Sequence, residues 1–110
     1  MKLIRSFVRP DKLDEIKQAL SGIHVRGLCV AETSDYAPQP HATTVWLGRE
    51  YTHDCSAKLQ IEVVVHDADV DEVVDAIIRA ARTRREGDGD VMVLPVDHRY
   101  NISDGHRDVS

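Results

Sequence analysis

The sequence is poor in the residues that mark several specialised classes of protein. Its 110 residues include 2 cysteines, Cys29 and Cys55, which are too few for a disulfide framework and are expected to stay reduced. The 14 basic residues are outnumbered by 19 acidic ones, and the net charge of −5 argues against nucleic acid as a partner. No apolar run approaches the roughly 18 residues of a membrane span, and the N-terminus lacks a signal peptide's apolar stretch. We therefore expect a cytoplasmic protein with no direct membrane insertion.

The residues that are present describe one domain of mixed secondary structure. Its length and its hydrophobic content of 42% fit a single unit, residues 1–110, with one core. Alternating or continuous apolar residues predict strands over residues 2–8, 25–33, 59–65 and 91–94. Helical spacing predicts a helix that begins at Pro10 and another that begins near Asp69. The second helix carries an apolar stripe of Val70, Val73, Val74, Ile77, Ile78 and Ala81.

The order of these elements is strand, helix, strand, a long connection, and again strand, helix, strand. Such an order predicts an α+β, ferredoxin-like βαββαβ fold, with two helices on one face of a four-stranded antiparallel sheet. The connection, residues 34–57, has no sustained period. An irregular segment of about 20 residues is unusual in so small a domain and is commonly functional or disordered. A plain loop insertion is the alternative.

The stretch over residues 81–90, Ala-Arg-Thr-Arg-Arg-Glu-Gly-Asp-Gly-Asp, is the most informative for function. Its Gly-Asp-Gly lets the backbone turn tightly and bring N–H groups close to a ligand. Arginines precede this turn, so the stretch has the parts of an anion site. It ends, however, in the acidic Asp90, where a phosphate site would favour a lysine. The alternative is that the arginines only complement the helix dipole.

Other candidate chemistries have weaker signals. The loop residues His41, His53, Asp54 and Cys55 include plausible metal ligands, but their spacing matches no known zinc motif, and we predict no metal site. Trp46 and Tyr51 are candidate partner anchors, or they simply pack the loop. No nucleophile and base can be placed together, so an enzyme is the least favoured class.

Several segments together match one family. They are residues 1–4 (Met-Lys-Leu-Ile), 9–15 (Arg-Pro-Asp-Lys-Leu-Asp-Glu), 27–32 (Gly-Leu-Cys-Val-Ala-Glu), 48–51 (Gly-Arg-Glu-Tyr), 58–65 (Lys-Leu-Gln-Ile-Glu-Val-Val-Val), 69–83 and 87–89. In these the chain resembles the nitrogen-regulatory PII signalling proteins, without gaps from Met1 to about Val96. The resemblance names a T-loop at about residues 36–56 and a B-loop at about 82–90, before a C-terminal tail from about 97.

The resemblance implies a homotrimer that is not an enzyme. Family members bind ATP or ADP in clefts between subunits, often with 2-oxoglutarate and magnesium, and dock T-loops onto enzymes, transporters or regulators. Gln39 and Lys58 resemble the residues that contact 2-oxoglutarate and its magnesium. Tyr51 occupies the position that some members uridylylate. The implied nucleotide-binding residues are Gly27, Leu28, Cys29, Val64, Arg82, Thr83, Arg84, Arg85, Gly87, Asp88, Gly89 and Asp90.

The departures from the family pattern concentrate at ligand positions. The lysine that ends the B-loop is replaced by Asp90, and two phosphate-clamping arginines of the tail are replaced by Asn101 and Ser103. The glycine-rich T-loop base becomes residues 35–38, Asp-Tyr-Ala-Pro, and the family's Thr-Gly-Lys becomes residues 83–85, Thr-Arg-Arg. Losing cations and gaining carboxylates opposes a triphosphate, because each close charge pair contributes about 4 kcal/mol before screening.

We therefore expect ADP, AMP or weakened ATP binding, with 2-oxoglutarate and magnesium doubtful. The regulated partner, an enzyme or transporter of nitrogen or carbon metabolism, is not identified by the sequence. Two alternatives remain open: a scaffold trimer of the same fold without nucleotide binding, and a metal-binding trimer like the divalent-cation-tolerance proteins.

Overall fold

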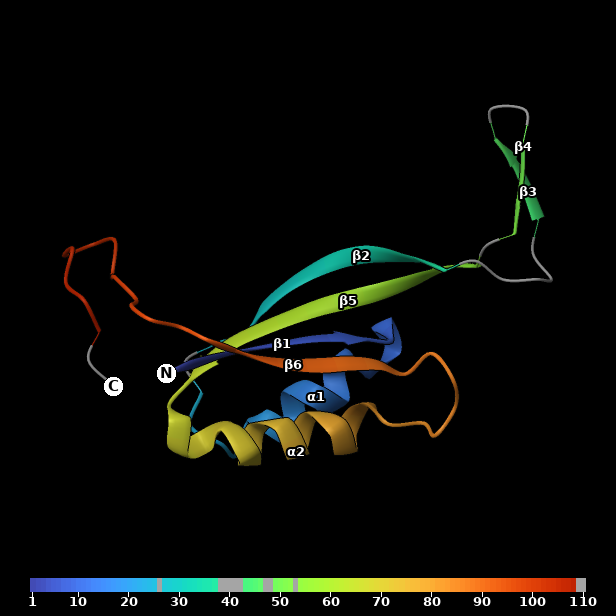
Figure 1. The fold of residues 1–110 in the computed structure, drawn as a ribbon. Coiled ribbons are helices and arrows are strands. Elements are labelled where there is room, and N and C mark those ends of the chain that lie inside the picture. Colours follow the sequence, from blue (N-terminus) through green and yellow to red (C-terminus); the bar gives the residue numbers. More distant parts are fainter. Residues whose placement is uncertain (26, 38–42, 47–48, 53, 109–110) are drawn as a thin grey trace.

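Two helices and a four-stranded antiparallel sheet form the body of the protein (Figure 1). The computed structural model describes residues 1–25, 27–37, 43–46, 49–52 and 54–108, with the backbone alone described between residues 35 and 56. The sheet has the order β2-β5-β1-β6. Both helices lie on one of its faces, which confirms the ferredoxin-like βαββαβ fold. The strands are β1 (Lys2–Val8), β2 (Cys29–Ala37), β5 (Asp54–Val65) and β6 (Gly89–Pro95), and the helices are α1 (Leu13–Leu20) and α2 (Val70–Ala81).

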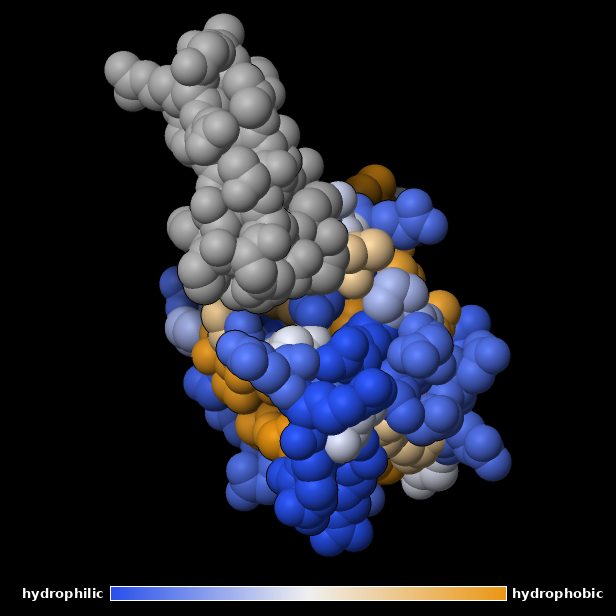
Figure 2. All heavy atoms as spheres, turned by 90° about the vertical axis from the view of Figure 1, so that its right-hand side faces the viewer, coloured by the Kyte–Doolittle hydropathy of each residue, from blue (hydrophilic) through white to orange (hydrophobic). Residues whose placement is uncertain are grey.

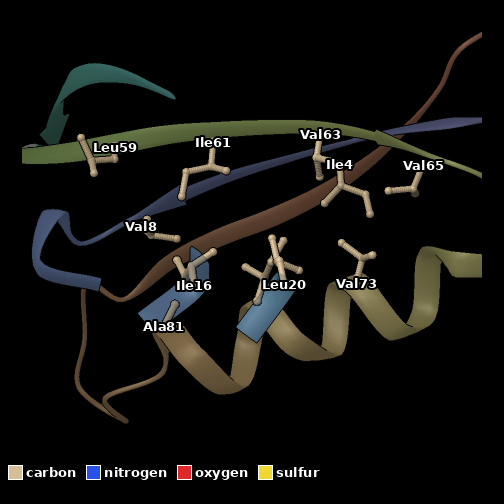
Figure 3. Close-up of a cluster of buried hydrophobic side chains, with 11 residues drawn as sticks. Ile4, Val8, Ile16, Leu20, Leu59, Ile61, Val63, Val65, Val73 and Ala81 are labelled. Carbon is tan, nitrogen blue, oxygen red and sulfur yellow. The ribbon is translucent and has the colours of Figure 1, made fainter. Parts of the chain in front are cut away.

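The core lies between the helices and the sheet (Figure 3). Alternate residues of β1 and β5 point toward the helices, as a strand's period of two requires. Their register pairs Ile4 with Val63 and Val8 with Leu59. The stripe predicted on the second helix supplies Val73, Ile77 and Ala81 to the same core, so the helical period was interpreted correctly. The complete buried set is Ile4, Val8, Ile16, Leu20, Leu59, Ile61, Val63, Val65, Val73, Ile77 and Ala81.

The opposite face of the sheet is not covered by any element of the described chain. It carries apolar side chains from neighbouring strands, because the register places Leu3 beside both Val64 and Leu94. Met92, on the same face of β6, is 42% exposed. Exposed apolar area on a sheet face favours association with another surface.

The second strand differs from its predicted bounds. The sequence predicted a strand over residues 25–33, but β2 begins at Cys29. Val25 instead donates its N–H to the Ile23 carbonyl at 2.9 Å, and its side chain packs against the core together with Leu28. Gly27 has φ +148, outside the range of a regular strand. The apolar residues before Cys29 therefore reflect core packing and not strand pairing.

The connection between β2 and β5 contains more regular backbone than expected. Both strands run on beyond the predicted strand bounds, with pairs that extend to Ala37 and Asp54. The part of the chain between these two strands also forms a separate two-stranded sheet (Figure 1), which consists of β3 (Thr43–Trp46) and β4 (Arg49–Thr52). Four-residue strands are too short to show a period, although β-branched and aromatic residues fit them.

Neither helix in the described part of the chain has the length and apolar character needed to cross a membrane.

Candidate functional site

The loop between α2 and β6, residues 82–88, is organised around one carboxylate. Asp88 accepts hydrogen bonds from the Thr83 amide at 2.8 Å and from the Arg84 amide at 3.0 Å, and also from the Thr83 hydroxyl. These donors, with Arg9, hold the pKa of the Asp88 carboxyl well below its usual range, because they stabilise the charged form. The anion that the amides of this loop bind is therefore the carboxylate of Asp88 itself.

Two cations, one just after β1 and one on β5, tie this loop to the body of the protein. Arg9, just after β1, donates its Nε to Asp88 at 3.0 Å and its Nη2 to the Glu86 carbonyl at 2.7 Å. Lys58 of β5 is 6% exposed and donates its Nζ to the Gly87 carbonyl at 2.6 Å. A buried ammonium close to a loop carbonyl fixes that carbonyl's direction. The loop is thus held on both sides.

The glycines of the loop are required by its geometry. Gly89 has φ +102, and a Cβ there would lie 1.7 Å from the Phe7 carbonyl oxygen. Gly87 has φ +92 and approaches the Arg9 guanidinium. Both positions lie in a backbone region that glycine adopts freely. The sequence-based prediction of a tight Gly-Asp-Gly turn is thus supported by the backbone.

The loop presents several charges to solvent at one end of the molecule, which Figure 2 shows as mostly hydrophilic. Arg82, Arg84 and Arg85 are exposed, and none forms an ion pair with another described residue. Asp90 is also exposed and lines a cavity of about 190 Å³ together with Arg82, Asp88 and Phe7. Exposed guanidinium groups attract an anion, whereas the Asp90 carboxylate opposes it. Arg82 and Asp90, which carry opposite charges, therefore line the same cavity.

A second group of the expected nucleotide-binding residues lies elsewhere. Gly27, Leu28, Cys29 and Val64 line one cavity of about 290 Å³. The same cavity contains Glu62, whose carboxylate lies 3.3 Å from the Arg5 Nε and accepts a hydrogen bond from the Gln60 side chain. Apolar walls with a few polar groups are typical of small-molecule sites.

A third cavity, of about 490 Å³, lies beside Lys58. Its other lining residues are Pro10, Glu32, Thr33, Ser34, Ala57 and Leu59. Gln39, the expected partner of Lys58 in effector binding, lies outside the described residues. Trp46 and Tyr51 lie in β3 and β4, where their backbones pair with Arg49 and Thr44, but their side chains are outside the described part. The same holds for Cys55, and His41 and His53 lie outside the described residues altogether.

The two groups of nucleotide-binding candidates lie at opposite ends of the sheet. Val64 and Lys58 are six residues apart on β5, which corresponds to about 20 Å at roughly 3.3 Å per residue. The 290 Å³ cavity is at the Val64 end, and the Asp88 loop is at the Lys58 end. Within the described part of one chain, the cavity of the first group and the loop of the second are therefore separate.

Three residues that hold the Asp88 loop or line the 290 Å³ cavity were not predicted from the sequence. Arg9 was considered only as part of a family segment, although it holds the Asp88 loop. Glu62 was considered only as part of the strand over residues 59–65, and Arg99 was not singled out, yet both line the 290 Å³ cavity. A charged residue flanked by apolar residues on β5 was the available signal for Glu62. The sequence contained no comparable signal for Arg99, because the position of its side chain depends on how the tail folds.

Asn101 and Ser103, the tail positions expected from the resemblance to replace two arginines, form a local turn. The Asn101 side-chain oxygen accepts a hydrogen bond from the Ser103 amide at 2.8 Å. Short polar side chains stabilise such turns. Among the described residues no group of three or more potential ligands could hold a metal ion.

Comparisons with known proteins identify the relatives of this sequence. The family model for Nitrogen regulatory protein P-II matches residues 1–106. A Nitrogen regulatory protein P-II of Synechocystis sp. is 41% identical over 108 residues, which cover 98% of this chain and 96% of the relative. Nitrogen regulatory protein GlnK2 of Haloferax mediterranei is 38% identical over 105 residues, 96% of this chain and 85% of the relative. A P-II protein of Rhizobium etli is 38% identical over 108 residues, 98% and 96% of the two chains.

Proposed function

Because this chain belongs to the nitrogen regulatory protein P-II family, whose members are non-enzymatic signal transducers, we propose that it is a homotrimeric sensor of a small phosphorylated effector. The effector binds in clefts between subunits, and the segment at about residues 36–56 regulates a partner enzyme or transporter. An adenine nucleotide, ADP or AMP in preference to ATP, fits the site best. Nitrogen and carbon metabolism is the expected setting.

The observation that carries this proposal is the separation of the two half-sites. The apolar cavity around Cys29 and Val64 and the Asp88 loop lie about 20 Å apart along β5. A second copy of the chain can place its loop against the first copy's cavity, which completes a site that one chain leaves open. The uncovered apolar face around Leu3 and Met92 supports such an assembly, because it is available to contact other copies.

The preference for fewer phosphates rests on charge. A triphosphate near Asp90 meets a carboxylate, and the Asp88 carboxylate already uses the amides of Thr83 and Arg84. The exposed Arg84 and Arg85 partly offset this repulsion. At an effective dielectric constant of about 20, a unit charge pair at 4 Å contributes about 4 kcal/mol before screening. Solvent around these exposed groups reduces that value, yet a fraction of it changes affinity tenfold or more.

Two measurements test this function. Light scattering coupled to size-exclusion chromatography is expected to give the mass of three chains. Isothermal titration calorimetry is expected to give tighter binding of ADP or AMP than of ATP. Micromolar affinity for ATP, equal to or above that for ADP, would contradict the altered preference. A stable trimer that binds none of the three nucleotides would favour the scaffold function instead.

The scaffold alternative is supported by one specific observation, the Asp90 carboxylate in the cavity that also contains Arg82. The metal-binding alternative depends on His53 and Cys55. Metal analysis of the purified protein, and of a His53→Ala variant, tests it, and failure to take up zinc or copper would exclude it.

A further inference from the structure

Arg99 is a cation that belongs to the apolar cavity. It follows β6, and its side chain lines the 290 Å³ cavity with Leu28, Cys29, Glu62 and Val64. The side chain is 41% exposed, so it stands at the edge of the cavity and not deep inside it. Among the described lining residues, Arg99 is the one that carries a positive charge.

The carboxylate that faces Arg99 comes from the end of the same chain. Asp108 lies with its Oδ2 3.5 Å from the Arg99 Nη1, and its amide donates to the Arg99 carbonyl at 2.7 Å. The segment 99–108 folds back as a hairpin, in which Tyr100 bridges to Arg107 and the Asn101 amide donates to the His106 carbonyl. The backbone of the hairpin therefore places Asp108 beside Arg99, independently of the ion pair.

The ion pair itself is weak, and the other acid nearby is already paired. At 3.5 Å and with both side chains partly exposed, the Arg99–Asp108 contact is of the surface kind, which contributes little. The Glu62 carboxylate is matched by Arg5 at 3.3 Å and by Gln60. An incoming anion therefore competes for Arg99 chiefly with Asp108.

We propose that Arg99 binds the phosphate nearest the sugar of a nucleoside mono- or diphosphate whose base occupies this cavity, and that Asp108 is a built-in competitor which that phosphate displaces. A guanidinium binds a phosphate through two parallel charge-assisted hydrogen bonds, a stronger contact than the existing ion pair. The proposal rests on the proposed function. It deepens that function by assigning a cation to a site from which Asp90, Asn101 and Ser103 have removed three.

The position of Arg99 also fits the proposed preference of the site for AMP and ADP over ATP. A cavity of about 290 Å³ is close to the lower limit of small-molecule sites and accommodates a nucleoside more readily than a long phosphate chain. A cation at its edge meets the first phosphate, whereas a third phosphate extends toward the Asp90 of the second copy whose loop completes the proposed site. Arg99 thus contributes equally to AMP and ADP binding and adds nothing specific to ATP.

Calorimetry with AMP, ADP and adenosine on four proteins tests the proposal. The proteins are the wild type, Arg99→Gln, Asp108→Asn and the control Arg107→Gln, which removes an exposed arginine from the same hairpin. Arg99→Gln is expected to weaken AMP and ADP binding about tenfold or more and to leave adenosine binding unchanged. Asp108→Asn is expected to tighten AMP binding about two- to fivefold, and Arg107→Gln to change it less than twofold.

Each contrary result has its own meaning. Equal losses for adenosine and AMP in Arg99→Gln would show a packing role and overturn the phosphate contact. Unchanged AMP and ADP binding in Arg99→Gln would overturn this inference but leave the proposed function standing. Weaker binding by Asp108→Asn would overturn the competitor role. A wild type that binds neither AMP nor ADP would overturn both this inference and the proposed nucleotide sensing.

Discussion

The Asp88 carboxylate accepts hydrogen bonds from both the hydroxyl and the amide of Thr83, five residues earlier in the chain. This contact closes the loop between α2 and β6 on itself. The Arg9 guanidinium joins the same carboxylate and the Glu86 carbonyl from outside. The loop is therefore ordered by charge and hydrogen bonding before any ligand arrives.

Asp88→Asn is expected to loosen this loop. An amide has one acceptor oxygen in place of two and carries no charge for Arg9, so the amides of Thr83 and Arg84 lose strong acceptors. Hydrogen exchange followed by mass spectrometry or NMR should show faster exchange at these two amides. Asp90→Asn is the matched control, because Asp90 is exposed, and its loop amides should exchange as in the wild type. Unchanged exchange in Asp88→Asn would contradict the role of this carboxylate.

The pH dependence of stability follows from the lowered pKa of Asp88. Its folded-state pKa lies below its ordinary value of 3.8, so the folded state binds this proton less readily than the unfolded state. The stability that Asp88 contributes is therefore present above about pH 4 and is lost as the pH falls through the folded-state pKa. Urea unfolding of the wild type and Asp88→Asn at pH 7 and pH 3 should show a smaller difference at pH 3. A difference that grows toward acid would contradict the assigned direction.

Gly89→Ala is expected to destabilise the protein. The new Cβ would lie 1.7 Å from the Phe7 carbonyl oxygen, and φ is +102. The backbone strain alone costs roughly 1–3 kcal/mol, and the clash adds to it. The control is Gly22→Ala, where no atom lies within 4 Å of the new Cβ, and a change within about 0.5 kcal/mol is expected. Urea denaturation at fixed protein concentration measures both, and equal effects in the two variants would argue against the close approach of β6 to Phe7.

Substitutions of two isoleucines, one buried and one exposed, are expected to have different effects on the free energy of unfolding. Ile77 is 0% exposed and Ile102 is 100% exposed. Ile77→Ala is expected to lower the free energy of unfolding by about 2–5 kcal/mol, because it removes transfer energy and leaves a cavity. Ile102→Ala should change it by less than about 0.5 kcal/mol. Since an oligomer's stability depends on concentration, both are measured at several protein concentrations. A large loss in Ile102→Ala would show that the tail contacts another copy.

Asp90→Lys is expected to raise the affinity for ATP. The substitution replaces a carboxylate by an ammonium group at the cavity shared with Arg82, and affinity should rise about tenfold or more. Asp14→Lys, an identical charge change at an exposed position of α1, controls for the altered net charge. Calorimetry on both variants measures the effect. If Asp90→Lys binds ATP no better than the wild type, the cavity at Asp90 is not part of a nucleotide site.

The sequence by itself determined the order and type of the main elements. The stripe of Val73, Ile77 and Ala81 at helical spacing fixes which face of α2 is buried, and the alternation of Ile61, Val63 and Val65 does the same for β5. These are local periods, and burying apolar residues on one face leaves few arrangements of the elements. The Gly-Asp-Gly turn could also be predicted from the sequence, because its backbone has positive φ angles that glycine adopts freely.

Only the tertiary structure decided which residues meet. Arg9 and Asp88 are 79 positions apart in sequence, and the Arg9 Nε lies 3.0 Å from the Asp88 carboxylate. Arg99 reaches the cavity of Cys29 only because the tail passes the start of β1 after it leaves β6. The apolar Val25 and Leu28 fit either a strand or core packing, and the backbone at Gly27 settles that choice. Periodicity reports which face of an element is buried, whereas contacts between distant charges depend on strand order and register, which local sequence does not encode.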